Sequence, residues 1–141
     1  MILGKNGIVE IGKNVFINAF TKFVISHHIK IGNDCTISWN CQFLDNDFHT
    51  INYENKAEKN DNGIIIGDHV WIGCNTMIYK AVTIPNGCVI ASDSVVKTSF
   101  NEENVLIGGN PAKILKRNIE WNRKSQLSPL ITIMLMGCEK P

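Results

Sequence analysis

The segment Asp45-Asn46-Asp47-Phe48-His49 brings two carboxylates and an imidazole close together in the chain. An imidazole, with an ordinary pKa of about 6.5, is the side chain best suited to take a proton from a hydroxyl group at neutral pH. Asp47 or Asp45 could hold the second ring nitrogen of His49 and favour the tautomer that accepts the proton. Either aspartate could instead end a strand by accepting a hydrogen bond from nearby backbone. The spacing does not choose between these roles.

The residues around this segment follow a six-residue repeat, and self-similarity of this kind indicates a repeat architecture. One aliphatic or aromatic anchor recurs per hexad, glycine often follows it, and a small residue recurs four places after it. The anchors are Ile11, Ile17, Phe23, Ile31, Ile37, Phe43, Ile66, Ile72, Ile78, Ile84, Ile90 and Val96.

The hexads predict an all-β fold, a parallel β-helix in which each short strand buries its apolar side chain against the next coil. An amphipathic helix would need apolar residues three and four apart, and a half-buried strand would alternate every two residues. After Phe43 the next anchor position would be His49, but the frame returns only at Ile66. The polar stretch between them predicts a protruding loop at about residues 50–63, and loops on a rigid scaffold commonly carry function.

Three features together resemble one family: the hexads, the Asp45–His49 segment, and "IGGNPAKILK" at residues 107–116. Over residues 8–117 the chain resembles the hexapeptide-repeat acyltransferases, and among them the acetyl-CoA-dependent O-acetyltransferases of sugars and capsular polysaccharides. The resemblance implies a left-handed coil and a homotrimer with active sites between subunits. The left hand does not follow from the repeat itself, because crossovers between parallel strands are normally right-handed.

By this resemblance His49 is the general base, with Asp47 or Asp45 orienting it. The acetyl group would move directly from acetyl-CoA to a hydroxyl in a ternary complex, with backbone amides binding the oxyanion. Two alternatives stay open: an N-acetyltransferase acting on an amino-sugar nucleotide, and a non-catalytic β-helix scaffold that binds no coenzyme A. Composition does not identify the acceptor.

The predicted β-helix domain covers residues 1–109, and residues 110–141 are expected to form a C-terminal helix and an apolar tail of the same single domain. Asn110 is a good N-cap and Pro111 a good first helical residue, so a short α-helix is expected from Pro111 onward. Lys113, Lys116 and Arg117 would then lie near the helix start, the unfavourable end of the helix dipole for positive charge. The resemblance offers the phosphates of coenzyme A as partners, and ordinary solvated side chains are the alternative.

The same resemblance implies which other residues would line the site. The pantetheine arm of coenzyme A would run along small residues, including Gly73, Ala91 and Ser92, toward Asn110 and Pro111. Trp39 and Asn40 could hold the acceptor by stacking and hydrogen bonding. Trp71 resembles a tryptophan near the active cleft of such enzymes, although it could equally cover a neighbouring subunit.

The remaining histidines are expected to lie on the surface. His27 and His28 fall in a widened corner, and His69 falls in a corner of the repeat. Some β-helix trimers, the gamma-class carbonic anhydrases, bind zinc through three histidines. The histidine spacing here does not build a tetrahedral site, so no metal is expected.

Composition limits the remaining possibilities. The 141 residues suit one domain, and a formal charge of +1 gives no reason to expect a nucleic acid or an anionic membrane as partner. Cys35, Cys41 and Cys88 fall at small-residue positions of the repeat, which predicts buried reduced thiols rather than a disulfide framework. No leader-like segment begins the sequence and no apolar run approaches the ~20 residues that span a bilayer. A cytoplasmic location is therefore expected.

Overall fold

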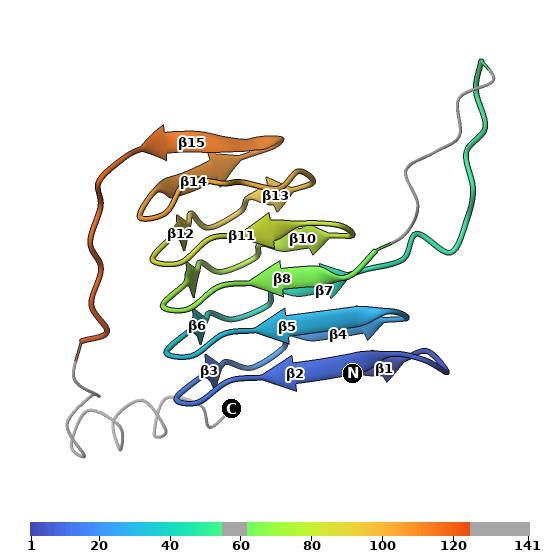
Figure 1. The fold of residues 1–141 in the computed structure, drawn as a ribbon, viewed down its shortest axis with the longest axis horizontal. Coiled ribbons are helices and arrows are strands. Elements are labelled where there is room, and N and C mark those ends of the chain that lie inside the picture. Colours follow the sequence, from blue (N-terminus) through green and yellow to red (C-terminus); the bar gives the residue numbers. More distant parts are fainter. Residues whose placement is uncertain (55–61, 125–141) are drawn as a thin grey trace, which may run out of the picture.

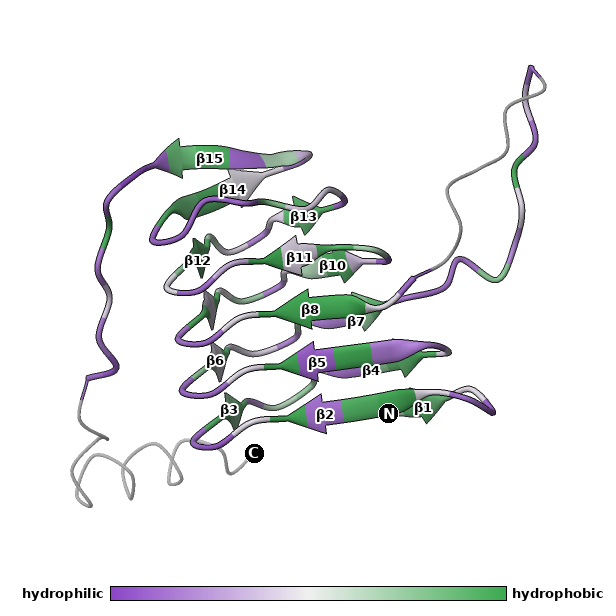
Figure 2. Ribbon diagram, viewed as in Figure 1, coloured by the Kyte–Doolittle hydropathy of each residue, from purple (hydrophilic) through white to green (hydrophobic). Residues whose placement is uncertain are grey.

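The computed structural model describes residues 1–54 and 62–124. Within these ranges the chain forms short strands that wind into stacked coils (Figure 1). The strands fall into three sheets, which give the coils a triangular cross-section. The hydrophobic residues follow the strands, and the corners between strands are mostly polar (Figure 2). None of the described residues belongs to a helix that could cross a membrane.

Three sheets make the sides of the prism, and the chain visits them in turn up to β13, after which β14 and β15 both join the third sheet. Sheet A contains β1 (Ile2–Leu3), β4 (Lys22–Ile25), β7 (Gln42–Leu44), β10 (Met77–Tyr79) and β13 (Val95–Val96). Sheet B contains β2 (Ile8–Ile11), β5 (His28–Ile31), β8 (Ile64–Ile66) and β11 (Thr83–Ile84). Sheet C contains β3 (Phe16–Ile17), β6 (Thr36–Ile37), β9 (Trp71–Ile72), β12 (Val89–Ile90), β14 (Leu106–Gly109) and β15 (Ala112–Lys116). We call the edges of the prism AB, BC and CA after the sheets that meet there.

The pairing register stacks the predicted anchors on one another. In sheet A, Phe23 pairs with Phe43, and their rings are parallel with centroids 4.8 Å apart. In sheet B, Ile31 pairs with Ile66, so the anchors before and after the insertion stack in the same register. The anchors from Phe23 onward are buried, and the predicted all-β repeat fold is therefore confirmed.

The corners of the prism are held by ladders of polar side chains. Many corner residues have a positive φ, among them Asn14, Asp34, Asn40 and Asn75, and Asn and Asp tolerate this conformation better than most residues. At the CA edge the Asn40 amide donates to Asn75 Oδ1 at 2.9 Å, and at the BC edge the Asn14 amide donates to Asp34 Oδ1 at 2.7 Å. These ladders fix each coil above the previous one.

Three cysteines occupy the small-residue positions as predicted. Cys35, Cys41 and Cys88 are fully buried free thiols. The Cys35 thiol donates to the Gly67 carbonyl oxygen at 3.1 Å, and the Cys41 thiol donates to the Gly73 carbonyl oxygen at 3.2 Å. Burial raises the pKa of all three thiols.

The predicted C-terminal helix is wrong for the described residues. Asn110 and Pro111 form a two-residue turn, after which β15 returns antiparallel to β14. Ala112 and Ile114 pack against the core at the end of the coil, while Lys113 faces solvent. A strand whose alternate side chains are apolar can cover the core at the end of the last coil. This strand therefore forms in spite of the local helix-start signals. Beyond residue 124 the expected helix and tail lie outside the described residues.

Candidate active site

The AB edge carries His49. The insertion leaves the prism after β7 and rejoins it at β8, and its described parts extend away from the coils (Figure 1). The centre of the predicted loop, residues 55–61, lies outside the described residues. His49 is exposed and belongs to a turn in which the Phe48 N–H donates to Asn46 Oδ1 at 2.6 Å. The backbone thus turns the chain outward just before the imidazole.

Asp45 is fully buried, and its carboxylate serves the backbone. One oxygen accepts a hydrogen bond from the Ser26 N–H at 2.7 Å, and the other accepts from the N–H groups of His27 and His28 at 2.8 and 2.9 Å. These amides form the widened corner of the coil below. Asp45 therefore ties the start of the insertion to that corner.

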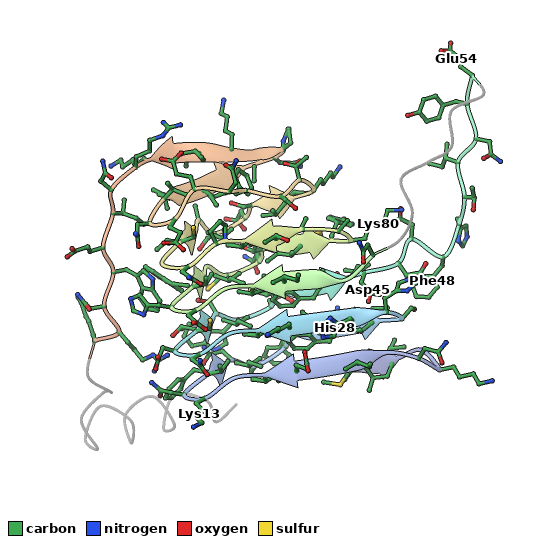
Figure 3. All side chains as sticks on the ribbon, viewed as in Figure 1. Lys13, His28, Asp45, Phe48, Glu54 and Lys80 are labelled. Carbon is green, nitrogen blue, oxygen red and sulfur yellow. The ribbon has the colours of Figure 1, made fainter. Side chains whose placement is uncertain are left out.

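Asp47 lies closer to the surface and is paired with a lysine. Its Oδ2 is 2.6 Å from Lys80 Nζ. Lys80 follows β10 on the coil above and is labelled, with Asp45, in Figure 3. The Lys80 side chain is 15% exposed and the Asp47 side chain 36% exposed. Asp45 and Asp47 thus anchor the insertion from below and from above, and the exposed His49 follows them.

Several predicted cofactor residues line the CA edge. Gly73 and Ala91 occupy equivalent corners of successive coils, and the Gly73 N–H donates to the Ile90 carbonyl oxygen at 2.8 Å. A Cβ on Gly73 would lie 2.6 Å from the Ser92 nitrogen, so close stacking of the coils already requires glycine there. Ser92 is exposed, and Gly108 pairs beside Ala91, which brings the Asn110-Pro111 turn to the same edge.

The predicted cationic residues lie on and after β15. Lys113 and Lys116 are exposed, and Lys113 pairs with Gly108 of β14. Arg117 forms a surface ion pair in which its Nε is 3.0 Å from a carboxylate oxygen of Glu102. The two lysines, rather than Arg117, are therefore the cations of this strand without a carboxylate partner among the described residues.

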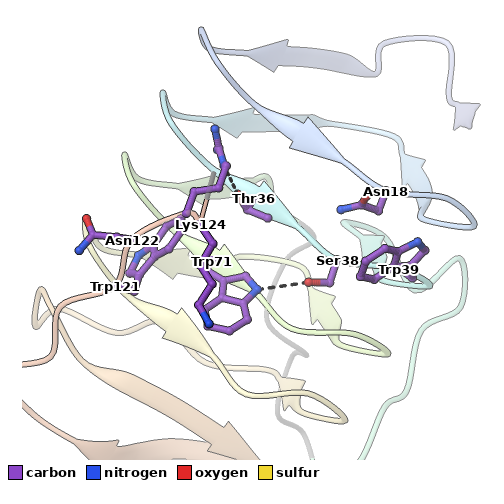
Figure 4. A pocket seen from close by; sticks show the side chains of 9 residues that line it. Asn18, Thr36, Ser38, Trp39, Trp71, Trp121, Asn122 and Lys124 are labelled. Carbon is purple, nitrogen blue, oxygen red and sulfur yellow. Dashed lines mark hydrogen bonds between the residues drawn. The ribbon is translucent and has the colours of Figure 1, made fainter. Parts of the chain in front are cut away.

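Trp39 and Trp71 border one cavity of ≈ 370 Å³ on sheet C (Figure 4). Trp71 is 41% exposed and its indole N–H donates to Ser38 Oγ at 3.2 Å. Trp39, at the CA edge, is 54% exposed. Asn40 belongs instead to the polar ladder of that edge, where its amide is used by Asn75.

Sequence reasoning missed the far wall of this cavity, which comes from Trp121, Asn122, Arg123 and Lys124. It also expected His69 to be a surface residue, but His69 is half-buried because Trp121 stacks on it with ring centroids 4.1 Å apart. The surface expectation for His69 is therefore wrong. No repeat relates these two positions, so the only sequence signal was an aromatic residue in a segment without hexads.

The predicted site residues thus fall into two groups on one chain. Asp45, Asp47 and His49 follow β7 at the AB edge, whereas Trp39 and Gly73 lie at the CA edge. Sheet A separates the two edges. Among residues 1–54 and 62–124, no three His, Cys, Asp or Glu side chains are grouped as metal ligands.

The comparisons with known proteins all point to one family. Residues 63–98 match the family model described as bacterial transferase hexapeptide (six repeats). The polysialic acid O-acetyltransferase of Neisseria meningitidis is 44% identical over 98 residues, covering 68% of this chain and 46% of the relative. The chain spans about half the length of curated relatives that it matches.

Two solved structures extend the comparison. The polysialic acid O-acetyltransferase OatWY superposes with a TM-score of 0.73 at 32% identity, covering 96% of this chain and 69% of that one. A hexapeptide-repeat acetyltransferase from Vibrio cholerae, solved with acetyl-CoA, gives a TM-score of 0.67 at 30% identity, covering 83% of this chain and 67% of that one. The predicted left-handed parallel β-helix is thereby confirmed.

Proposed function

Because the chain belongs to the hexapeptide-repeat acetyltransferase family, we propose that it transfers an acetyl group from acetyl-CoA to a hydroxyl of a sugar or capsular polysaccharide. One observation carries the proposal beyond family membership. The regular coil is broken at the AB edge by an insertion whose first residues are anchored from both sides and present an exposed imidazole. We place the reaction in the cytoplasm, as expected from the sequence.

His49 is the general base of this reaction. Its neutral imidazole takes the proton of the acceptor hydroxyl as the oxygen attacks the thioester carbonyl carbon. The carbon–sulfur bond then breaks, the acetyl ester forms, and the coenzyme A thiolate takes the proton back from the imidazolium. Backbone N–H groups of an adjoining coil stabilise the oxyanion of the tetrahedral intermediate. No covalent enzyme intermediate is formed.

Asp47, rather than Asp45, is the residue that orients His49. Both oxygens of Asp45 already accept hydrogen bonds from buried backbone amides, which leaves the carboxylate committed to the coil below. Asp47 is partly exposed and next but one to His49. Its pairing with Lys80 holds the segment in position, and the carboxylate retains capacity to accept a hydrogen bond from the imidazole.

The active site is completed by a second subunit. The His49 group and the Trp39–Gly73 row lie on different edges of one prism with sheet A between them, which supports a site that two subunits share. In a homotrimer the AB edge of one subunit lies against the CA edge of the next. Coenzyme A then runs along Gly73, Ala91 and Ser92 to the Asn110-Pro111 turn, with Lys113 and Lys116 near its phosphates.

The acceptor lies on the aromatic surface of Trp39 and Trp71. Exposed indoles provide faces on which a sugar ring stacks, and the Trp71 indole is already oriented by Ser38. A polysaccharide acceptor is supported by the relatives named for polysialic acid. The product of this activity is an oxygen ester, whereas the product of N-acetylation is an amide.

The test is thiol release from acetyl-CoA with a panel of neutral, carboxylated and amino sugars, followed by treatment of the product with hydroxylamine. Acceptor-dependent release that yields a hydroxylamine-labile ester supports the proposal. A stable amide product would identify an N-acetyltransferase instead. Failure of acetyl-CoA to bind the assembled protein would leave the non-catalytic scaffold.

A further inference from the structure

The segment after β15 runs back along the BC edge, from the end of the coil toward its start (Figure 1). We call residues 117–124 the strap. The Ile119 N–H donates to the Asn104 carbonyl oxygen at 2.9 Å near the top of the edge. At the bottom the Arg123 guanidinium lies over the Phe16 ring at 4.1 Å and donates to Thr36 Oγ1 at 3.0 Å. The strap is thus fixed to both early and late coils.

Trp121 is fixed by reciprocal contacts in the middle of the strap. Its indole N–H donates to the His69 carbonyl oxygen at 2.9 Å, and His69 Nε2 lies 2.8 Å from the Trp121 carbonyl oxygen. His69 occupies a positive-φ corner position where neighbouring coils carry Asp34, Gly87 and Asn104. Histidine, like Asn and Asp, is enriched among the residues that adopt this conformation. Here its ring forms the platform on which Trp121 stacks.

The strap closes one side of the cavity on sheet C. The Trp121 ring lies 6.0 Å from the Trp71 ring at an angle of 44°, so the two indoles form adjoining walls. Ser38 and Trp39 form the opposite side (Figure 4). The volume of ≈ 370 Å³ lies within the range of about 300–1,000 Å³ typical of small-molecule sites.

The charge of the cavity comes from the strap as well. Arg123 and Lys124 line it, and no Asp or Glu does. The Arg123 guanidinium donates only to neutral oxygens, those of Asn14, Cys35 and Thr36, so its positive charge is not neutralised by these bonds. Lys124 is exposed and has no ion-pair partner among the described residues. Aromatic walls with uncompensated cations fit a sugar ring that bears an anionic group.

We propose that the strap makes this cavity a subsite for a carboxylated sugar of the acceptor, with Trp121 and Trp71 as ring platforms and Lys124 as the carboxylate contact. This inference rests on the proposed sugar acetyltransferase and deepens it, because it assigns the preference for an acidic acceptor to the C-terminal strap. The positive charge of Arg123 adds to the attraction for the carboxylate, and its hydrogen bonds hold the strap to the first coils.

Binding is measured first, because it does not require turnover. The native protein is titrated with a sialic acid tetrasaccharide and with its methyl ester, and tryptophan fluorescence is recorded. We expect tighter binding of the acid, and Lys124→Gln should reduce its affinity by about fivefold or more while leaving the ester unchanged. Lys22→Gln, which removes an exposed lysine from sheet A, is the matched charge control and should change neither affinity.

Two further variants test the aromatic wall. Trp121→Leu should weaken binding of both glycans by about tenfold, and Trp121→Phe should recover part of the loss. Circular dichroism and light scattering confirm that each variant keeps the native fold and assembly. In turnover, Lys124→Gln should raise KM for the acidic acceptor and leave KM for acetyl-CoA and kcat near native values.

The outcomes separate the two proposals. Equal affinity for acid and ester, or pocket variants that bind both glycans like the native protein, overturns the subsite even if acetyl transfer is observed. Loss of assembly in Trp121→Leu together with no glycan response in the native protein shows a neighbouring subunit in the cavity and also overturns it. Selective glycan binding without thiol release supports the subsite and contradicts the acetyltransferase.

Discussion

Lys80 and Asp47 form an ion pair of 2.6 Å that joins the coil above the insertion to the segment that carries His49. The lysine is the more buried partner, so the pair fixes a point on the insertion relative to the rigid prism. The position of the proposed base is therefore set by tertiary contacts and not by the repeat.

This pair leads to a prediction that separates orientation from anchoring. Asp47→Asn should lower kcat by about tenfold or more, because an amide stabilises the imidazolium that forms during proton transfer less than a carboxylate does. Lys80→Met removes the anchor but keeps the carboxylate, so its loss of kcat should be smaller. Steady-state kinetics with saturating substrates measure both. An equal loss of kcat in the two variants would show that Asp47 only anchors the insertion.

Asp45 should matter for stability. Asp45→Ala leaves three backbone amides of the Ser26–His28 corner without their acceptor, and the expected loss is about 3 kcal/mol or more in the free energy of unfolding. Urea denaturation measures the change. Asp47→Ala, two residues away and partly exposed, is the matched control and should lose less than about 1 kcal/mol. Similar values for the two variants would contradict the assignment of the buried role to Asp45.

The buried thiols predict a loss of stability at alkaline pH. Burial raises the pKa of Cys35, Cys41 and Cys88, so the folded state holds these protons more tightly than the unfolded state, whose thiols titrate near about 8.5. Their contribution is fully present below the unfolded pKa and is lost as pH rises toward the folded pKa.

The check is the melting temperature at pH 7, 8, 9 and 10 for the native chain and for the triple Cys→Ser variant. Serine suits the position because Ser94 already occupies it with its hydroxyl donating to the Ala91 carbonyl oxygen at 2.6 Å. The decline above about pH 8.5 should be shallower in the variant. Parallel curves for the two proteins would rule out the thiols as its cause.

Lys113 and Lys116 should contribute to coenzyme A binding through charge. Lys113→Gln is expected to raise KM for acetyl-CoA by about fivefold with little change in kcat, since contacts to remote phosphates contribute uniform binding. The effect should shrink at high salt, because exposed charges are screened. Arg117→Gln, which breaks only the pair with Glu102, serves as control. A KM in Lys113→Gln equal to that of the control would remove Lys113 from the cofactor site.

The prism itself could be predicted from sequence because its physical cause is periodic. Each coil needs one buried anchor per side, and the pairs Phe23–Phe43 and Ile31–Ile66 show that the same hexad frame persists on both sides of the insertion. The interruption after Phe43 could be predicted for the same reason, because the expected apolar anchor is absent at the next position of the repeat.

The C-terminal region could not be predicted in this way. Asn110 and Pro111 are residues of helix starts and also of tight turns, and the local signals could not reveal that β14 was available for pairing. The alternation of Ala112 and Ile114 was the competing strand signal. Contacts such as His69 with Trp121 join residues far apart in the chain with no repeat relating them, so only the structure reveals them.

The catalytic role of His49 is tested by comparing His49→Ala with His27→Ala, which removes another exposed histidine from the same edge. Thiol release from acetyl-CoA is measured with a saturating carboxylated glycan. If His49 is the general base, His49→Ala lowers kcat by about 100-fold or more while acetyl-CoA still binds, and His27→Ala keeps the native rate. Native turnover in His49→Ala would contradict the assignment of His49 as the general base.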